Sequence, residues 1–132
     1  MKKHYLLLLL SLSFLNFGCE SFFDCIIPLE PELPNAQFPI GSTETYYYTD
    51  LTAEVNNEPR DDDYDYFFDV VGLPNGMDYF VNFRTISLEG NPEETGTFEV
   101  TVRLWVDGPF NNNNDSILCN DTTSKTYLLI IE

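Results

Sequence analysis

Strict alternation of apolar and polar residues from Thr97 to Asp107 constrains the fold of this chain more than any other feature. The apolar positions are Phe98, Val100, Val102, Leu104 and Val106. Successive side chains of a β-strand point to opposite faces of the sheet, so these apolar side chains would all share one face. The pattern predicts a long strand that buries one face in a core and leaves the other polar.

Other stretches repeat this period of two. One is Thr45–Val55, with Tyr47, Leu51, Ala53 and Val55 on one side; another is Tyr64–Val70, with Tyr64, Tyr66, Phe68 and Val70 on one side; shorter strands are expected at Tyr79–Asn82, Thr85–Glu89 and Lys125–Ile131. Clusters of Gly, Pro and Asn separate these stretches, and no long window after the N-terminus has a helical period. We therefore expect an all-β fold, a sandwich of about seven strands over residues 36–132.

The N-terminal residues have the composition of an export signal. Lys2 and Lys3 precede the apolar run Tyr5–Leu15, and Gly18 provides a small residue for cleavage. A permanent transmembrane helix needs about 20 apolar residues, which is longer than this run. Residues 1–18 are therefore expected to be a cleaved signal peptide.

The residue after the expected cleavage is a cysteine. Residues Leu15–Cys19 resemble the lipobox of bacterial lipoproteins, in which a small residue precedes a cysteine that receives diacylglycerol. The resemblance implies lipidation of Cys19 and a membrane anchor in the bacterial cell envelope, in the outer membrane and either periplasmic or surface-facing. The alternative is an ordinary cleaved signal in which Cys19 is an unmodified thiol.

The chain contains three cysteines, so one is left over when two of them pair. If Cys19 carries lipid, then Cys25 and Cys119 remain to form a disulfide in an oxidising compartment. The alternative is two free thiols. Between Cys19 and the expected domain, Pro28, Pro31 and Pro34 recur at intervals of three, which favours an extended tether over residues 19–35.

Four sequence elements resemble a family of bacterial Ig-like domains related to the cadherin-like domains of the dystroglycan type. They are the Gly-Leu-Pro turn in Gly72–Met77, the short strand Thr85–Ser87, the Gly-x-Pro turn and aromatic residue in Gly90–Phe98, and the alternating strand that ends at Asp107. The resemblance covers residues 64–132. It implies an Ig-like β-sandwich that serves in contact or adhesion.

The chain is strongly acidic. Its net charge is −16, and removal of Lys2 and Lys3 with the signal leaves four basic residues against 22 acidic ones, a net charge of −18. Such a surface repels nucleic acid and anionic lipid headgroups, so attachment to a membrane would depend on the lipid. Hydrophobic residues make up 43% of the chain, which is enough to fill a core.

The residues needed for common catalytic sites are missing from the expected domain. The chain has one histidine, His4, which belongs to the expected signal peptide. This excludes Ser-His-Asp and Cys-His catalysis and histidine-based metal sites in the mature protein. We expect a non-enzymatic protein that acts as an interaction, adhesion or spacer module.

An acidic cluster is the one candidate for a metal site. Asp61, Asp62, Asp63 and Asp65 offer closely spaced carboxylates, which are ligands that Ca²⁺ accepts, and the resembled family includes calcium-dependent domains. The motif of cadherin repeats and the EF-hand loop are absent. A solvated loop, extended by repulsion between like charges, is the favoured interpretation, and no other cofactor is expected.

Three aromatic residues are candidates for ligand contact. Tyr46 and Tyr48 lie on the polar side of their strand, and Trp105 lies opposite the apolar side of Thr97–Asp107. If exposed, they would stack on a sugar or on a partner protein; the alternative is that the N-terminal segment or the loop after Gly108 covers them. Their presence supports a second hypothesis, a carbohydrate-binding surface lipoprotein of a nutrient-uptake system.

Two short stretches resemble an O-glycosylation signal that some gram-negative bacteria use on exported proteins. They contain Ser116 and Thr122, each directly after an aspartate. Asn114 and Asn120 also begin Asn-x-Ser/Thr sequons, which depend on a matching transferase in the host. The sequence leaves open whether any of these residues is modified.

Overall fold

The computed structural model describes residues 25–109 and 117–132. The expected signal peptide, Cys19, Asn114 and Ser116 lie outside these residues. The described chain forms strands β1 (Glu30–Glu32), β2 (Tyr47–Thr52), β3 (Glu54–Asn56), β4 (Asp65–Val71), β5 (Met77–Asn82), β6 (Thr85–Gly90), β7 (Gly96–Asp107) and β8 (Thr122–Ile131), and a short 3-10 helix, η3 (Asp61–Asp63). The all-β prediction is therefore confirmed. In this part of the chain, no helix is both long and apolar enough to cross a membrane.

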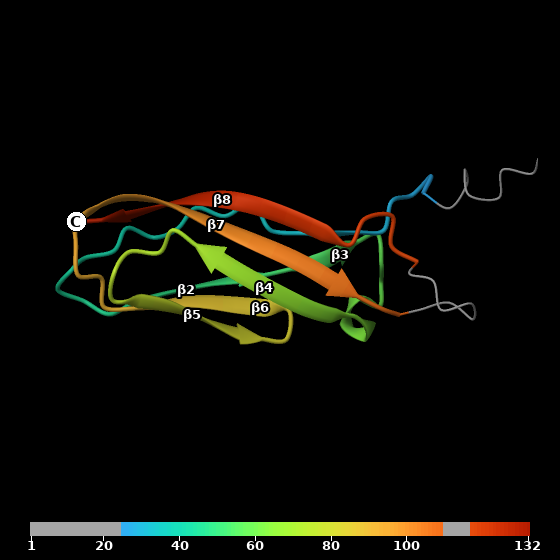
Figure 1. Cartoon of the computed structure of the whole chain (residues 1–132), viewed down its shortest axis with the longest axis horizontal. Coiled ribbons are helices and arrows are strands. Elements are labelled where there is room, and N and C mark those ends of the chain that lie inside the picture. Colours follow the sequence, from blue (N-terminus) through green and yellow to red (C-terminus); the bar gives the residue numbers. More distant parts are fainter. Residues whose placement is uncertain (1–24, 110–116) are drawn as a thin grey trace, which may run out of the picture.

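The strands form three antiparallel sheets. One has the order β2-β6-β5, another the order β4-β7-β8, and β1 pairs with β3 in a two-stranded sheet. In Figure 1, β7 and β8 run along one side of the molecule and β5 and β6 along the other. Buried side chains from both three-stranded sheets belong to one core cluster, so each sheet has an inner face and an outer face.

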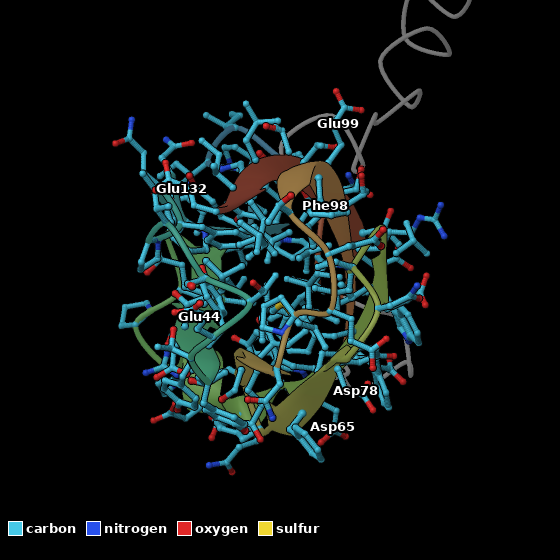
Figure 2. The ribbon with its side chains drawn as sticks, turned by 90° about the vertical axis from the view of Figure 1, so that its left-hand side faces the viewer. Glu44, Asp65, Asp78, Phe98, Glu99 and Glu132 are labelled. Atoms are coloured by element: carbon cyan, nitrogen blue, oxygen red, sulfur yellow. A yellow bond between two sulfur atoms is a disulfide. The ribbon has the colours of Figure 1, made fainter. Side chains whose placement is uncertain are left out.

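The alternation in β7 is confirmed by the burial of its side chains. Val100, Val102, Leu104 and Val106 are at most 3% exposed, whereas Trp105 is 43% exposed. Of the inner positions predicted in Thr45–Val55 and Tyr64–Val70, Val70 is partly buried and the others are buried, among them Leu51 and Tyr66. Figure 2 shows side chains filling the space between the sheets, and Glu99 on the outside.

The segment expected to be a tether contributes to the folded domain. Pro31 lies in β1 opposite Val55 of β3, and Leu33 is 1% exposed in the core. The Tyr127 hydroxyl donates a hydrogen bond to the carbonyl of Pro34 at 2.8 Å. A proline without an N–H group is compatible with β1 because, in the part of the chain that the structure describes, this strand has a neighbouring strand on one side only.

The predicted turn between β4 and β5 is also present. The Met77 N–H donates to the carbonyl of Pro74 at 3.2 Å, and Gly72 has a φ of 91°. Leu73 and Met77 are partly buried against the core. The left-handed conformation at Gly72 explains why a glycine is needed at this position.

The predicted cysteine pair is confirmed. The sulfur atoms of Cys25 and Cys119 are 1.99 Å apart, and the Cα atoms are 5.8 Å apart. Close by, the Cys119 N–H donates to the carbonyl of Leu29 at 2.8 Å. The alternative of two free thiols is therefore wrong, and the pair ties the start of the described chain to the residues just before β8.

Candidate functional site

The outer face of the β4-β7-β8 sheet carries the candidate functional site. Strand register places Phe67, Trp105 and Thr122 in one row across the three strands. The adjoining row contains Asp69, Arg103 and Ser124. We call these six residues the Trp105 face. Their positions alternate with core residues, so their side chains point away from the core.

Two aromatic rings stack at one end of this face. The ring centroids of Phe67 and Trp105 are 5.5 Å apart, and the ring planes differ by 9°. Phe67 is 42% exposed and Trp105 43% exposed. Neighbouring positions on antiparallel strands bring the side chains close enough for this contact. An exposed aromatic pair offers apolar surface to a binding partner. Because the two rings already stack on each other, their side chains need little further ordering on binding.

Polar groups lie directly beside the aromatic pair. Arg103 donates a hydrogen bond from a terminal guanidinium nitrogen to the Asp69 carboxylate at 3.0 Å. A cavity of about 450 Å³ is lined by Arg103, Asp69 and Trp105 together with the β8 residues Thr122, Thr123 and Ser124. The cavity therefore combines an aromatic wall with N–H donors, carboxylate acceptors and hydroxyl groups. This set can hold a polar ligand that also has an apolar surface.

Tyr46 and Tyr48 do not belong to this face. Tyr48 lies on β2 in the other three-stranded sheet, where its hydroxyl is 3.4 Å from the Ser87 hydroxyl. Tyr46 precedes β2, and desolvation and the nearby Glu89 carboxylate raise its pKa. Both side chains are more than half exposed. The three aromatic candidates are thus exposed, but the structure separates the two tyrosines from Trp105.

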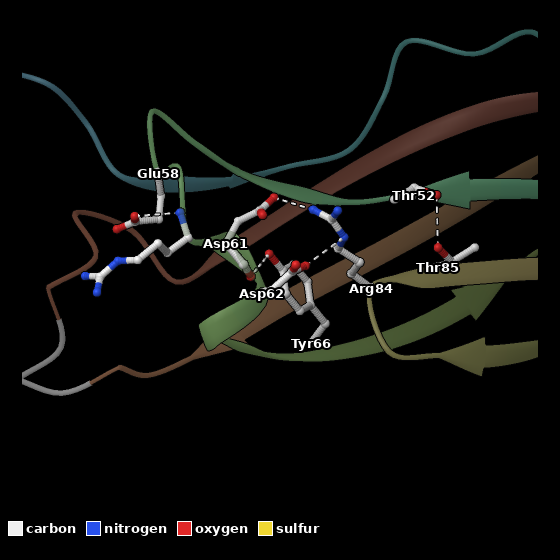
Figure 3. Close-up of polar contacts among 8 residues, drawn as sticks. Thr52, Glu58, Asp61, Asp62, Tyr66, Arg84 and Thr85 are labelled. Carbon is white, nitrogen blue, oxygen red and sulfur yellow. Dashed lines mark hydrogen bonds and ion pairs between the residues drawn. The ribbon is translucent and has the colours of Figure 1, made fainter.

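The acidic cluster contacts basic side chains of the protein. Figure 3 shows the Arg84 guanidinium group facing both Asp61 and Asp62; the distances from guanidinium nitrogen to carboxylate oxygen are 2.5 Å and 3.4 Å. Arg60 lies 4.0 Å from Asp63 in the same way. Asp65, the fourth calcium candidate, lies in β4 opposite Asp107. The Arg84 guanidinium group therefore lies where a cation would neutralise the Asp61 and Asp62 carboxylates.

No group of three or more His, Cys, Asp or Glu side chains suited to a metal ion occurs in the described ranges 25–109 and 117–132.

Of the suggested glycosylation residues, Thr122 is exposed at the start of β8. Its backbone is held by Asn120, whose side-chain amide donates to the Thr122 carbonyl at 2.9 Å. Thr122 therefore lies on the Trp105 face itself.

Sequence reasoning identified Trp105 but missed Phe67, Asp69 and Arg103. Phe67 carried a usable signal, because it is an aromatic residue at a polar position between Asp65 and Asp69. The missing information was the strand register, which places Phe67 directly opposite Trp105.

Comparisons of the chain with protein-family models, with curated proteins and with solved structures found no match.

Proposed function

We propose that this chain is a non-enzymatic lipoprotein of the bacterial cell envelope, anchored through lipid on Cys19, and that its Ig-like β-sandwich domain binds a partner through the Trp105 face. The exposed stack of Phe67 and Trp105 is the observation that carries the binding role. Two three-stranded sheets with one shared core support the sandwich architecture. The lipobox-like residues Leu15–Cys19 support the anchor.

A binding role fits the chemistry of the domain better than a catalytic one. The sequence after residue 18 contains no histidine. Cys25 and Cys119 are joined at disulfide distance, so neither sulfur is available as a nucleophile. On the Trp105 face the one carboxylate, Asp69, is engaged by Arg103. The face offers contact and hydrogen bonding, and its groups fill none of the usual nucleophile and base roles.

Affinity capture tests the binding role. We expect the purified chain to retain a partner from an envelope extract, and we expect Trp105→Ser and Phe67→Ser each to remove most of that partner. Phe80→Ser is the matched control, because Phe80 is 57% exposed on the outer face of the other three-stranded sheet. The melting temperature of each variant should be measured to check that the variant is folded. Equal recovery with Trp105→Ser and with the unaltered chain would contradict the proposal.

Fractionation tests the anchor separately. The unaltered protein is expected in the membrane fraction, and Cys19→Ala is expected to move it to the soluble fraction. Mass spectrometry of the unaltered protein should show diacylglycerol on the new N-terminus. An unacylated N-terminus, or membrane retention of Cys19→Ala, would remove the anchor and leave the binding role standing.

A carbohydrate ligand is the second candidate, favoured by the cavity beside Trp105. A sugar ring has apolar C–H faces that match an aromatic wall and hydroxyl groups that match Arg103, Asp69 and the hydroxyls of β8. A glycan array should show binding that is lost in Trp105→Ala and weakened in Arg103→Met. Phe80→Ala serves as the control and keeps the binding. Binding that survives Trp105→Ala would exclude this site as the sugar site.

A further inference from the structure

A second cavity, separate from the Trp105 face, lies along the free edge of β8. Its volume is about 960 Å³. Phe38 and Ile40, from the segment between β1 and β2, line one side, and Thr126, Leu128 and Ile130 of β8 line the other. We call this cavity the β8 groove. It is large enough to hold a ligand the size of a short peptide.

β8 is an edge strand of its sheet, because among residues 25–109 and 117–132 its only strand partner there is β7. At one end of the free edge, Gly41 donates to the Ile130 carbonyl at 2.8 Å and accepts from the Glu132 N–H at 2.9 Å. Even-numbered residues of β8 therefore turn their backbone groups away from β7, and odd-numbered ones turn them toward β7. The free edge of β8 therefore already forms one parallel bridge, between Gly41 and Ile131.

The edge is open over the next residues. By the same alternation, the backbone N–H and C=O groups of Thr126 and Leu128 point outward, toward the groove. Within residues 25–109 and 117–132, neither backbone makes a hydrogen bond on this side. An open row of donors and acceptors at strand spacing is a template for pairing with another extended chain.

The walls of the groove supply apolar area. Ile40 is 61% exposed, Leu128 58% and Ile130 39%. Phe38 stacks on the ring of Tyr127, with 4.9 Å between the ring centroids, which holds the far wall in place. Alternate side chains of an added strand would cover these apolar groups.

A cationic side chain lines the groove as well. Arg60, Arg84 and Arg103 each contact a carboxylate, whereas Lys125, the remaining basic residue of the described ranges, does not. Its ammonium group donates to the Asn35 side-chain oxygen at 3.0 Å and to the carbonyl of Leu33. Three donors are available on an ammonium group, so one remains for an acidic group of a ligand.

We propose that the β8 groove binds an extended peptide segment of a partner protein as an added strand on β8. The outward backbone groups of Thr126 and Leu128 would pair with the peptide backbone, and the apolar walls would take its alternate side chains. A carboxylate on the peptide would face Lys125. Acyl chains lack the hydrogen-bonding groups that this edge needs, and sugars do not repeat N–H and C=O groups at strand spacing.

The test starts from a phage-displayed library of linear peptides selected on the immobilised chain. The expected result is an enriched peptide with apolar residues at alternate positions and an acidic residue near one end. A synthetic copy should bind, and methylation of its β8-facing backbone nitrogens should weaken binding at least tenfold. On binding, the amide protons of Thr126 and Leu128 should become protected from hydrogen exchange.

Leu128→Pro tests the edge directly. The Leu128 N–H points away from β7, so proline there removes an outward donor and leaves the β7–β8 ladder intact. We expect at least a tenfold loss of peptide affinity. Val81→Pro is the matched control: the Asn91–Gly76 hydrogen bond fixes the alternation of β5, so the Val81 N–H also points outward, on an edge of the other sheet. This control should keep the affinity.

Several results would overturn the proposal. One is a library that yields no enriched peptide, and another is a peptide whose affinity survives both backbone methylation and Leu128→Pro. A concentration-dependent dimer that Leu128→Pro abolishes would assign the groove to a second copy of this chain instead. If Leu128→Pro fails to fold, the methylated peptide and the exchange of the Thr126 amide still decide the question. Trp105→Ser should leave peptide binding unchanged, which separates this site from the Trp105 face.

Discussion

At the scale of single residues, Gly72 holds a backbone conformation that other residues adopt at a cost. Its φ is 91°, and a Cβ atom at this position would lie 2.1 Å from the carbonyl oxygen of Glu99. Gly72 thus lets the turn after β4 pass directly against β7. Two separate effects, the strained φ and the backbone clash, oppose any side chain at this position.

Replacing Gly72 should therefore destabilise the domain. We expect Gly72→Ala to lower the free energy of unfolding by about 2 kcal/mol or more, measured by urea denaturation. Gly96→Ala is the matched control: its φ of 154° is also unfavourable for a side chain, but the nearest atoms to its added Cβ lie 3.5 Å away in the Phe98 ring, so this variant lacks the backbone clash. A loss at Gly72 no larger than that at Gly96 would contradict this account.

Four tyrosines lie in the core with their hydroxyl groups protonated. Their rings are buried, and three hydroxyls donate to backbone carbonyls: Tyr47 to Pro39, Tyr66 to Asp61 and Tyr127 to Pro34. Burial raises the pKa of Tyr47, Tyr64 and Tyr127 from 10.0 to about 12, and it also raises the pKa of Tyr66. The folded state therefore favours the neutral phenol.

The sign of the pH dependence follows from these raised pKa values. Above pH 10 the unfolded chain loses tyrosine protons first, so stability is full below pH 10 and falls as the pH rises toward about 12. Denaturation followed together with tyrosinate absorbance measures this loss. Tyr127→Phe should make the loss shallower, because it removes one of the tyrosines whose pKa burial raises. Constant stability between pH 10 and 12 would contradict the prediction.

Burial at these positions could be predicted from the sequence alone, because a period of two depends on neighbouring residues only. Tyr66 and Val102 were assigned to the inner face in this way, and both are buried. The contact between Phe67 and Trp105 could not be predicted. Their positions are 38 residues apart in the sequence, and only the register of β4 against β7 makes them neighbours.

At the scale of elements, the segment that leads into β2 serves as part of the domain. β1 pairs with β3, Leu33 enters the core, and Gly41 bridges to Ile131 at the end of β8. Proline spacing indicated an extended backbone over residues 19–35, and within this range Glu30–Glu32 form strand β1. It could not indicate that the extended backbone finds partners, because those partners lie in β3 and β8, far along the chain.

Truncation of Leu33 tests whether this segment stabilises the domain. Leu33 is 1% exposed, so Leu33→Ala should cost about 2 to 5 kcal/mol of unfolding free energy, as for other buried leucines. Ile27→Ala is the control, since Ile27 is 67% exposed, and it should change stability by less than about 0.5 kcal/mol. Similar small effects for both variants would show that the segment is only a tether.

At the scale of the whole molecule, one covalent link joins the beginning of the described chain to the residues before β8. Cys25 and Cys119 are 94 positions apart, so the loop that they close contains most of the domain. Closing a loop of this length restricts the unfolded chain strongly. The pairing could be predicted by counting cysteines. The contact between Cys119 and Leu29 could not, because it depends on how the chain folds.

Removing the link should therefore be costly. In the chain-entropy model, a loop of this length contributes about 4 to 5 kcal/mol, and Cys25→Ser with Cys119→Ser should lower the free energy of unfolding by a similar amount. The reduced unaltered protein should match the double variant. A double variant as stable as the oxidised protein would mean that the link contributes nothing to stability.

The same link has a mechanical consequence. If tension is applied across the protein from the two sides of the Cys25–Cys119 pair, the load passes through the sulfur atoms and bypasses the loop between them. Fully stretched, the chain between these two cysteines, which are 94 positions apart, would add about 300 Å of length. With the bond intact that length cannot be released. The backbone of β1 to β7 then carries none of the tension that passes from Cys25 through the disulfide to the residues after Cys119.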